Sequence, residues 1–210
     1  MASKILVDEL APQSHATDVT ITTGKKIAGA NTQFKVTGGS SGQVLTNDGS
    51  DGLSWGAAPP ALVKRAVICQ QEAQNTAAGT ATSGSWQVRV LNNEIYDDIG
   101  ITLSSNVFTL PAGTFYINWS CPARQVNSHM TRLYDVTNTS VVEYGTAGYD
   151  ANGAYDTHDR SWGYAKVIIT GATEYQIEHR VHTTVASWGF GYPSDFSVEK
   201  YTTVEIEQTA

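Results

Sequence analysis

"GTFYINWSCPA", residues Gly113–Ala123, shows the clearest periodicity in this sequence. Its large apolar side chains occupy every second position, at Phe115, Ile117, Trp119 and Cys121. Successive side chains of a β-strand point to opposite faces of the sheet, so this alternation predicts a strand with one buried face. We expect these four side chains to lie in the core.

The same period of two recurs on both sides of that strand, and no stretch shows the period of a helix. Val63, Arg65, Val67 and Cys69 share one parity, Trp86, Val88 and Val90 share another, and Tyr175, Ile177, His179 and Val181 alternate with polar residues. The expected strands lie near residues 63–70, 85–91, 99–110, 113–121, 130–136, 140–145, 163–170, 174–183 and 197–207. Eight to nine strands without helices predict an all-β fold, a jelly roll or a similar β-sandwich of two sheets.

The first 60 residues differ in composition from the rest of the chain. Of 5 Trp, 10 Tyr and 5 Phe, only Phe34 and Trp55 precede Pro60, so the aromatic side chains that build a core are C-terminal. "GGSSGQVLTNDGSDGLSWG", residues 38–56, consists largely of turn formers around short strand-like fragments. "APPA", residues 58–61, is a stiff spacer. We therefore expect an N-terminal segment and glycine-rich neck over residues 1–60 and a folded head over residues 61–210.

Charge and cysteine content exclude several classes of protein. The net charge is −7 and no basic stripe is present, which argues against binding to nucleic acid. No apolar run approaches the ~18 residues that span a bilayer, and no secretory signal is apparent, so we expect neither membrane insertion nor export by the general pathway. Cys69 and Cys121 are expected to be two buried thiols rather than a disulfide.

Signatures of enzymes are also missing from the sequence. There is no nucleophile elbow, phosphate-binding loop, His-Glu-x-x-His or Cys-x-x-Cys, and we expect neither catalysis nor a cofactor. Asp97 and Asp98 could pair for glycoside cleavage only in a loop, because adjacent strand residues face opposite ways, so a solvated turn is favoured. "DANGAYDTHD", residues 150–159, is favoured as a polar loop over a cation site because it lacks the final glutamate and flanking helices of a calcium loop.

Several longer stretches resemble known families. "NVFTLPAGTFYINWSCPA", residues 106–123, resembles the tumour-necrosis-factor-like and complement-head jelly rolls, in which an aromatic residue and a Pro-x-Gly turn precede an aromatic-rich strand. "HMTRLYDVTNTSVVEYGTAGYD", "EYQIEHRVHTTVASWGFG" and "YTTVEIEQ" resemble the C-terminal domains of bacteriophage tail fibres, especially those of phages that infect marine and cyanobacterial hosts. "MASKILVDELAP" and "GQVLTNDGSDGLSWG" are similar to the opening and the glycine-rich unit of such proteins.

The resemblance implies a homotrimeric, non-enzymatic virion protein of the tail or fibre, made in the host cytoplasm, whose head contacts a glycan or protein receptor on the host surface. A short apolar patch suits docking onto another virion protein, and three copies of the neck could bury its few apolar residues around an axis. The alternative is a structural or decorating virion protein with no receptor-binding role. The expected anchoring residues are Ile5, Leu6, Val7 and Leu10, and the expected trimer core of the neck comprises Val44, Leu45, Leu53 and Trp55.

Aromatic residues in loop-like, glycine-rich segments are the candidates for receptor contact. A ring carried on a loop offers a large contact area at a small entropic cost. For Trp162, Trp188 and Phe190, closure of the ends of the sandwich or of the trimer axis is an equal alternative. The six candidates are Tyr149, Tyr155, Trp162, Trp188, Phe190 and Tyr192, of which the three tyrosines are the most strongly expected at the surface.

Overall fold

The computed structural model describes residues 40, 41, 43–47, 53–57, 63–153 and 158–209 of the chain. The chain divides into two compact units, Met1–Pro59 and Pro60–Ala210. Among the described residues, no helix is long and apolar enough to cross a membrane.

The described part of the first unit is an antiparallel hairpin of β1 (Gln43–Asn47) and β2 (Leu53–Ala57). Leu45 pairs with Trp55, and both side chains are half-buried, as is Val44. The two strand-like fragments of the glycine-rich stretch therefore pair with each other. The anchoring candidates Ile5, Leu6, Val7 and Leu10 and the side chain of Leu53 lie outside the described residues, and the trimer core of the neck stays a prediction.

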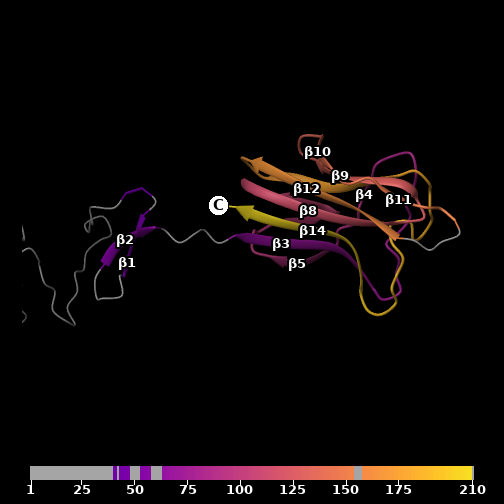
Figure 1. Ribbon diagram of the computed structural model, residues 1–210, viewed down its shortest axis with the longest axis horizontal. Helices are drawn as coiled ribbons and strands as arrows, with labels where there is room; N and C mark the ends of the chain where they lie inside the picture. Colours follow the sequence, from indigo (N-terminus) through magenta and orange to yellow (C-terminus); the bar gives the residue numbers. More distant parts are fainter. Residues whose placement is uncertain (1–39, 42, 48–52, 58–62, 154–157, 210) are drawn as a thin grey trace, which may run out of the picture. The chain divides into compact units, whose positions relative to one another are not determined.

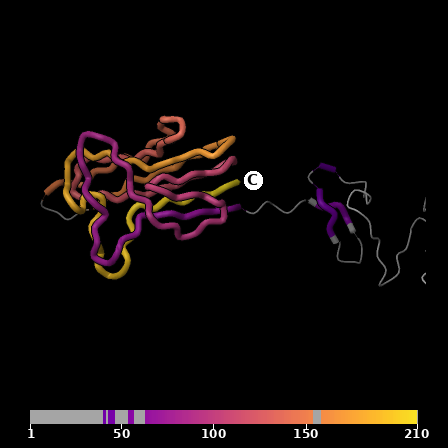
Figure 2. The backbone as a smooth tube through the Cα atoms, turned by 180° about the vertical axis from the view of Figure 1, so that it is seen from behind, coloured from indigo at the N-terminus to yellow at the C-terminus, as the bar shows by residue number. Residues whose placement is uncertain are grey.

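The second unit, which we call the head, is a sandwich of two antiparallel sheets (Figures 1 and 2). One sheet has five strands in the order β12 (His158–Ile169), β8 (Gly113–Arg124), β14 (Glu199–Thr209), β3 (Lys64–Glu72) and β5 (Asn93–Asp97). The other has seven strands, with the order β10 (Ser140–Tyr144), β9 (Asn127–Asp135), β13 (Thr173–Val181), β7 (Val107–Leu110) and β6 (Thr102–Ser104). In this second sheet β11 (Gly148–Asp150) also pairs with β9, and β4 (Gln87–Val88) pairs with β13.

The strand pairing identifies the topology. Among the eight main strands, the first pairs with the last (β3 with β14), the second with the seventh (β7 with β13), the third with the sixth (β8 with β12) and the fourth with the fifth (β9 with β10). Such nested pairing arises when one long hairpin rolls into two sheets, which is the jelly roll. The prediction of an all-β jelly-roll head is confirmed.

The core lies between the two sheets. Phe115, Ile117, Trp119 and Cys121 are all buried, as their alternation predicted, and Trp119 Nε1 donates a hydrogen bond to Thr131 Oγ1 at 2.8 Å. Burial of one such apolar side chain contributes roughly 1.5–3 kcal/mol. Both cysteines are buried free thiols, as expected.

Around β3 and β4, fully buried residues have the opposite parity to the valines that indicated each strand. In β3, Ala66 and Ile68 face the core, whereas Val63 is 52% exposed. Around β4, Val88 is 40% exposed and the side chain of Arg89 is fully buried. Apolar alternation alone therefore did not identify the inward face of these strands.

The head has two distinct ends. At one end, which we call the base, Lys64 pairs with Gln208 and Thr114 pairs with Thr209, so the chain enters and leaves there. At the other end Arg124 pairs with His158, and Glu72 pairs with Glu199 (Figure 1). We call this second end, with the segments 73–90, 124–127, 146–150 and 182–199, the apex.

Candidate functional site

Two accessible aromatic rings lie beside a buried cation at the apex. Trp188 and Tyr192 lie in the segment between β13 and β14, with ring centroids 5.9 Å apart at an angle of 67°. The guanidinium of Arg124, the last residue of β8, lies 4.3 Å from the Tyr192 ring centroid and 5.5 Å from that of Trp188. Trp188 is 41% exposed and Tyr192 is 48% exposed, so both rings can be reached from outside. We call Arg124, Trp188 and Tyr192 the apical cluster.

The sequence "SWGFGYP" explains how these rings are held. Gly189 and Gly191 pass close to other segments of the chain. A Cβ at Gly189 would lie 2.6 Å from Ala81 Cβ, and a Cβ at Gly191 would lie 2.4 Å from Tyr201 Cδ1. Gly191 also has a φ of 143°, which favours glycine. The carbonyl of Gly189 accepts a hydrogen bond from Arg124 N at 3.0 Å, which fixes the segment to the end of β8.

Glu199 anchors the far side of the same segment. Its carboxylate accepts hydrogen bonds from Ser194 N at 2.9 Å, Ser194 Oγ at 2.9 Å and Asp195 N at 2.7 Å. The Ser194 amide is the main cause that lowers the pKa of Glu199 below its ordinary value. The apical segment is therefore attached at both ends.

Phe190 differs from the other candidates for receptor contact because it is only 6% exposed. Its ring stacks on the imidazole of His179 at 5.3 Å, and the guanidinium of Arg89 lies 4.1 Å from its centroid. Phe190 thus closes the end of the sandwich, which is the alternative that the sequence left open, and is not part of the accessible surface of the head.

The remaining candidates lie in three places. Tyr149 in β11 is 66% exposed at the apex, whereas Trp162 is 57% exposed on the outer face of the five-stranded sheet. Tyr155 lies outside the described residues. The structure therefore brings together Trp188 and Tyr192, and separates Trp162 from them.

Asp97 and Asp150, two of the acidic residues considered from the sequence, have structural partners. The Asp97 carboxylate accepts hydrogen bonds from the amides of Ile99, Gly100 and Ile101, which form a turn. Asp150 is buried and accepts from Gln125 N at 2.5 Å. Within the part of the chain that the structure describes, no group of three His, Cys, Asp or Glu residues could hold a metal ion.

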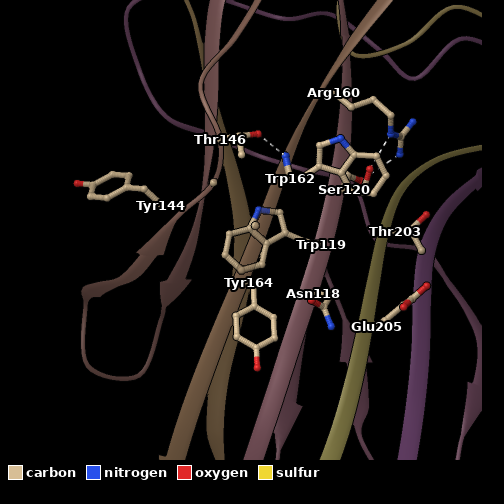
Figure 3. Close-up of a pocket in the computed structure, with 12 residues that line it drawn as sticks. Asn118, Trp119, Ser120, Tyr144, Thr146, Arg160, Trp162, Tyr164, Thr203 and Glu205 are labelled. Atoms are coloured by element: carbon tan, nitrogen blue, oxygen red, sulfur yellow. Dashed lines mark hydrogen bonds between the residues drawn. The ribbon is translucent and has the colours of Figure 1, made fainter.

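A groove of about 820 Å³ lies on the outer face of the five-stranded sheet (Figure 3). At one end of it Arg160 Nε donates to Ser120 Oγ at 2.6 Å, and Trp162 N donates to Thr146 Oγ1 at 2.9 Å. Along the same face, Tyr164 is 55% exposed and stacks on Tyr116, with 6.0 Å between centroids. The lining residues are Asn118, Trp119, Ser120, Tyr144, Gly145, Thr146, Arg160, Trp162, Gly163, Tyr164, Thr203 and Glu205.

Sequence reasoning missed a buried polar cluster beneath the apex. Arg89 is fully buried, and its guanidinium donates to Thr202 Oγ1 at 2.9 Å and to the carbonyls of Phe190 at 3.0 Å and Pro122 at 3.1 Å. Nη1 also lies 3.3 Å from His179 Nδ1. These partners come from four separate segments, so no local pattern could have indicated them.

Comparisons with known proteins give structural similarity only. No family model matches the sequence, and no curated protein matches it. The chain is similar to the globular domain of the zebrafish complement 1qA protein, with 12% identity, coverage of 72% of this chain and 97% of that one, and a TM-score of 0.44. It is also similar to Eiger TNF from S. frugiperda, with 8% identity, 72% and 94% coverage and a TM-score of 0.46. Murine APRIL gives 4% identity, 70% and 99% coverage and a TM-score of 0.43. The assignment of the fold rests on the strand pairing described above.

Proposed function

We propose that this chain is a non-enzymatic, homotrimeric virion protein of a bacteriophage tail fibre, and that the apex of its head contacts a glycan or protein receptor on the host surface. The observation that carries the proposal is the pair of exposed rings of the apical cluster, Trp188 and Tyr192, at the end of the head opposite the base. In this account the N-terminal segment attaches the chain to another virion protein, through Ile5, Leu6, Val7 and Leu10.

The position of the cluster favours recognition. The chain enters the head at the base, so the apex is the end of the head away from that entry point. Tryptophan, tyrosine and arginine are the residues that most often dominate binding energy at protein interfaces. A structural or decorating role would leave the loop aromatics buried, but Trp188, Tyr192 and Tyr149 are exposed.

Alanine at Trp188 or Tyr192 is expected to weaken binding to host cells by roughly tenfold or more, the effect of losing an aromatic hot spot. The measurement is the concentration of purified protein that halves adsorption of intact phage particles. Tyr96→Ala is the matched control, because Tyr96 is equally exposed, at 49%, but lies on β5 away from the apical cluster. If both apical variants compete as well as the unaltered chain, the structural or decorating role is favoured.

The outer face of the five-stranded sheet supports association with further copies. Trp162, Tyr164 and Ile168 on β12 are 57%, 55% and 72% exposed, and the groove lies beside them. Exposed apolar side chains concentrated on one sheet face are typical of interaction surfaces. Three copies would also combine individually weak receptor contacts into a stronger attachment.

Tyr164→Glu is expected to lower the fraction of a species with the mass of three chains, because it places a charge among apolar side chains that a trimer would bury. Analytical ultracentrifugation of the full chain measures the mass, and circular dichroism checks the fold. Val198→Glu is the control, since Val198 is 53% exposed at the apex. An unchanged trimer in Tyr164→Glu, or a monomeric unaltered chain, would contradict this interface.

A further inference from the structure

A series of four side chains runs from the buried polar cluster to the edge of the apex; hydrogen bonds join the first three, and the last is at ion-pair distance. Arg89 Nη1 lies 3.3 Å from His179 Nδ1, and His179 Nε2 lies 3.0 Å from His129 Nδ1. His129 Nε2 then lies 3.4 Å from Asp159 Oδ2. The side chain of Asp159 is 41% exposed, whereas that of His129 is fully buried.

The chain has one direction, which fixes the tautomer of both histidines. A guanidinium can only donate, so Nδ1 of His179 accepts and its proton sits on Nε2. That N–H donates to Nδ1 of His129, so the proton of neutral His129 sits on its own Nε2 and points toward Asp159. In each imidazole, Nδ1 is the only nitrogen left for a second proton.

A second proton on either histidine would sit on Nδ1, where it would face an N–H group that donates to this nitrogen in the neutral form. On His179 it would face the N–H of Arg89, and on His129 it would face the N–H of His179. Burial is the main cause that lowers the pKa of both histidines, and the charge of Arg89 lowers the pKa of His179 further. The carboxylates of Asp159 and Asp150 act in the other direction on His129 but do not outweigh burial. The Arg160 guanidinium and the Cys121 thiol act on Arg89, and the Arg160 amide donates to Asp159 Oδ1 at 2.7 Å.

Both exposed segments of the apex are attached to this chain. At one end, the Phe190 carbonyl accepts from Arg89 Nη2 at 3.0 Å, and its ring stacks on His179. At the other end, Asp159 Oδ2 accepts from Tyr149 N at 3.0 Å. The main core cluster contains none of these residues.

We propose that Arg89, His179, His129 and Asp159 form an acid-sensitive latch: protonation of the histidines breaks this series of contacts and loosens the two apical segments that carry Trp188, Tyr192 and Tyr149, which keep their other attachments. The latch is a property of the head itself and does not depend on what the apex binds. The main core between the sheets stays closed, since it packs without the latch.

The sign of the pH dependence follows from the lowered pKa values. A freed histidine has a pKa of about 6.5. The closed form is therefore fully favoured above that pH and loses stability as the pH falls through it toward the lower pKa of the closed form. In acid, the equilibrium constant for opening rises by about tenfold for each unit by which the pKa of a histidine in the open form exceeds its pKa in the closed form.

Hydrogen exchange of the full chain, corrected for the intrinsic effect of pH on exchange, tests the latch between about pH 8 and pH 5. We expect the amides of Tyr149 and Phe190 to lose protection in acid, while amides of β8 and β14 in the main core keep theirs. The variant with His129→Gln and His179→Gln keeps one donor and one acceptor at each position without titrating, so its apical protection should not depend on pH. His182→Gln changes an exposed histidine that is not part of the latch, so this variant should respond to pH as the unaltered protein does.

Nuclear magnetic resonance of the imidazole nitrogens in the unaltered protein provides a test that needs no variant. The latch requires the Nε2–H tautomer of His129 and His179 at neutral pH, and protonation over the same pH range as the loss of apical protection. An Nδ1–H tautomer, or full apical protection after the histidines have protonated, would overturn the proposal. So would an unchanged acid response in the double glutamine variant.

Discussion

Replacement of Arg89 by methionine is expected to lower the free energy of unfolding of the head by about 3–5 kcal/mol. Methionine fills much of the volume but cannot donate, so Thr202 and the carbonyls of Pro122 and Phe190 would be left buried without their donor. An unsatisfied buried group costs about 1–3 kcal/mol. Burial lowers the pKa of Arg89 to about 10, which still leaves the guanidinium charged at neutral pH. Urea unfolding monitored by tryptophan fluorescence measures the loss.

Two further variants separate the loss of the Arg89 charge from the loss of its hydrogen-bond donors, and both from the removal of an arginine in general. Arg89→Lys restores the charge but not the planar fork of donors, so we expect it to recover only part of the stability. Arg180→Ala removes an exposed arginine of β13 and should change stability by no more than about 0.5 kcal/mol. A stable Arg89→Met protein would mean that the guanidinium does not hold the apex together.

Gly163→Ala is expected to destabilise the head by about 1–3 kcal/mol, the usual cost of overpacking. The backbone of Gly163 in β12 lies against the indole of Trp119 in β8, and a Cβ there would lie 1.9 Å from Trp119 Cζ2. The fully packed indole must then move, which also disturbs its hydrogen bond to Thr131. Thermal unfolding followed by circular dichroism reports the change.

Gly171→Ala is the matched control, because a Cβ at Gly171 meets nothing within 4 Å. Trp119→Phe makes room beside Gly163. Gly163→Ala should therefore lower the stability of the head less in the Trp119→Phe background than in the unaltered chain. Equal costs in both backgrounds would show that the indole is not what excludes a side chain at this position.

The sequence indicated the fold class because strong alternation in long strands depends on burial of one whole face. The predicted burial of Phe115, Ile117 and Trp119 in β8 is confirmed for that reason. In β3 the alternation favoured the parity of Val63, Val67 and Cys69. Cys69 is fully buried, but Val63 is exposed, and Ala66 and Ile68 of the other parity face the main core. A half-buried outer face carries apolar residues too, so apolar alternation does not say which face is inside.

The candidate site was only partly accessible to sequence reasoning. The sequence marked the aromatic, glycine-rich segment around Trp188 and Tyr192 as a candidate for contact. It did not indicate that Phe190 between them turns inward onto His179. Arg89, Arg124 and His129 gave no local signal, because their roles depend on segments that are distant in sequence and meet only in the folded sandwich.

The apical cluster and the latch lie next to each other, which has a consequence for any partner that binds the apex. Phe190 contacts the latch, while its neighbours Trp188 and Tyr192 carry the exposed rings. A partner that requires the closed arrangement of these rings will bind more weakly in acid, and by linkage will lower the pH at which the latch opens.

Electron microscopy of intact particles labelled with antibody against residues 63–209 tests the central claim most directly, because it locates the head on the virion. We expect label at the free tips of projecting fibres, where an exposed apex can meet the host surface. Label confined to the capsid shell or to the inner collar of the tail would contradict host recognition by this head.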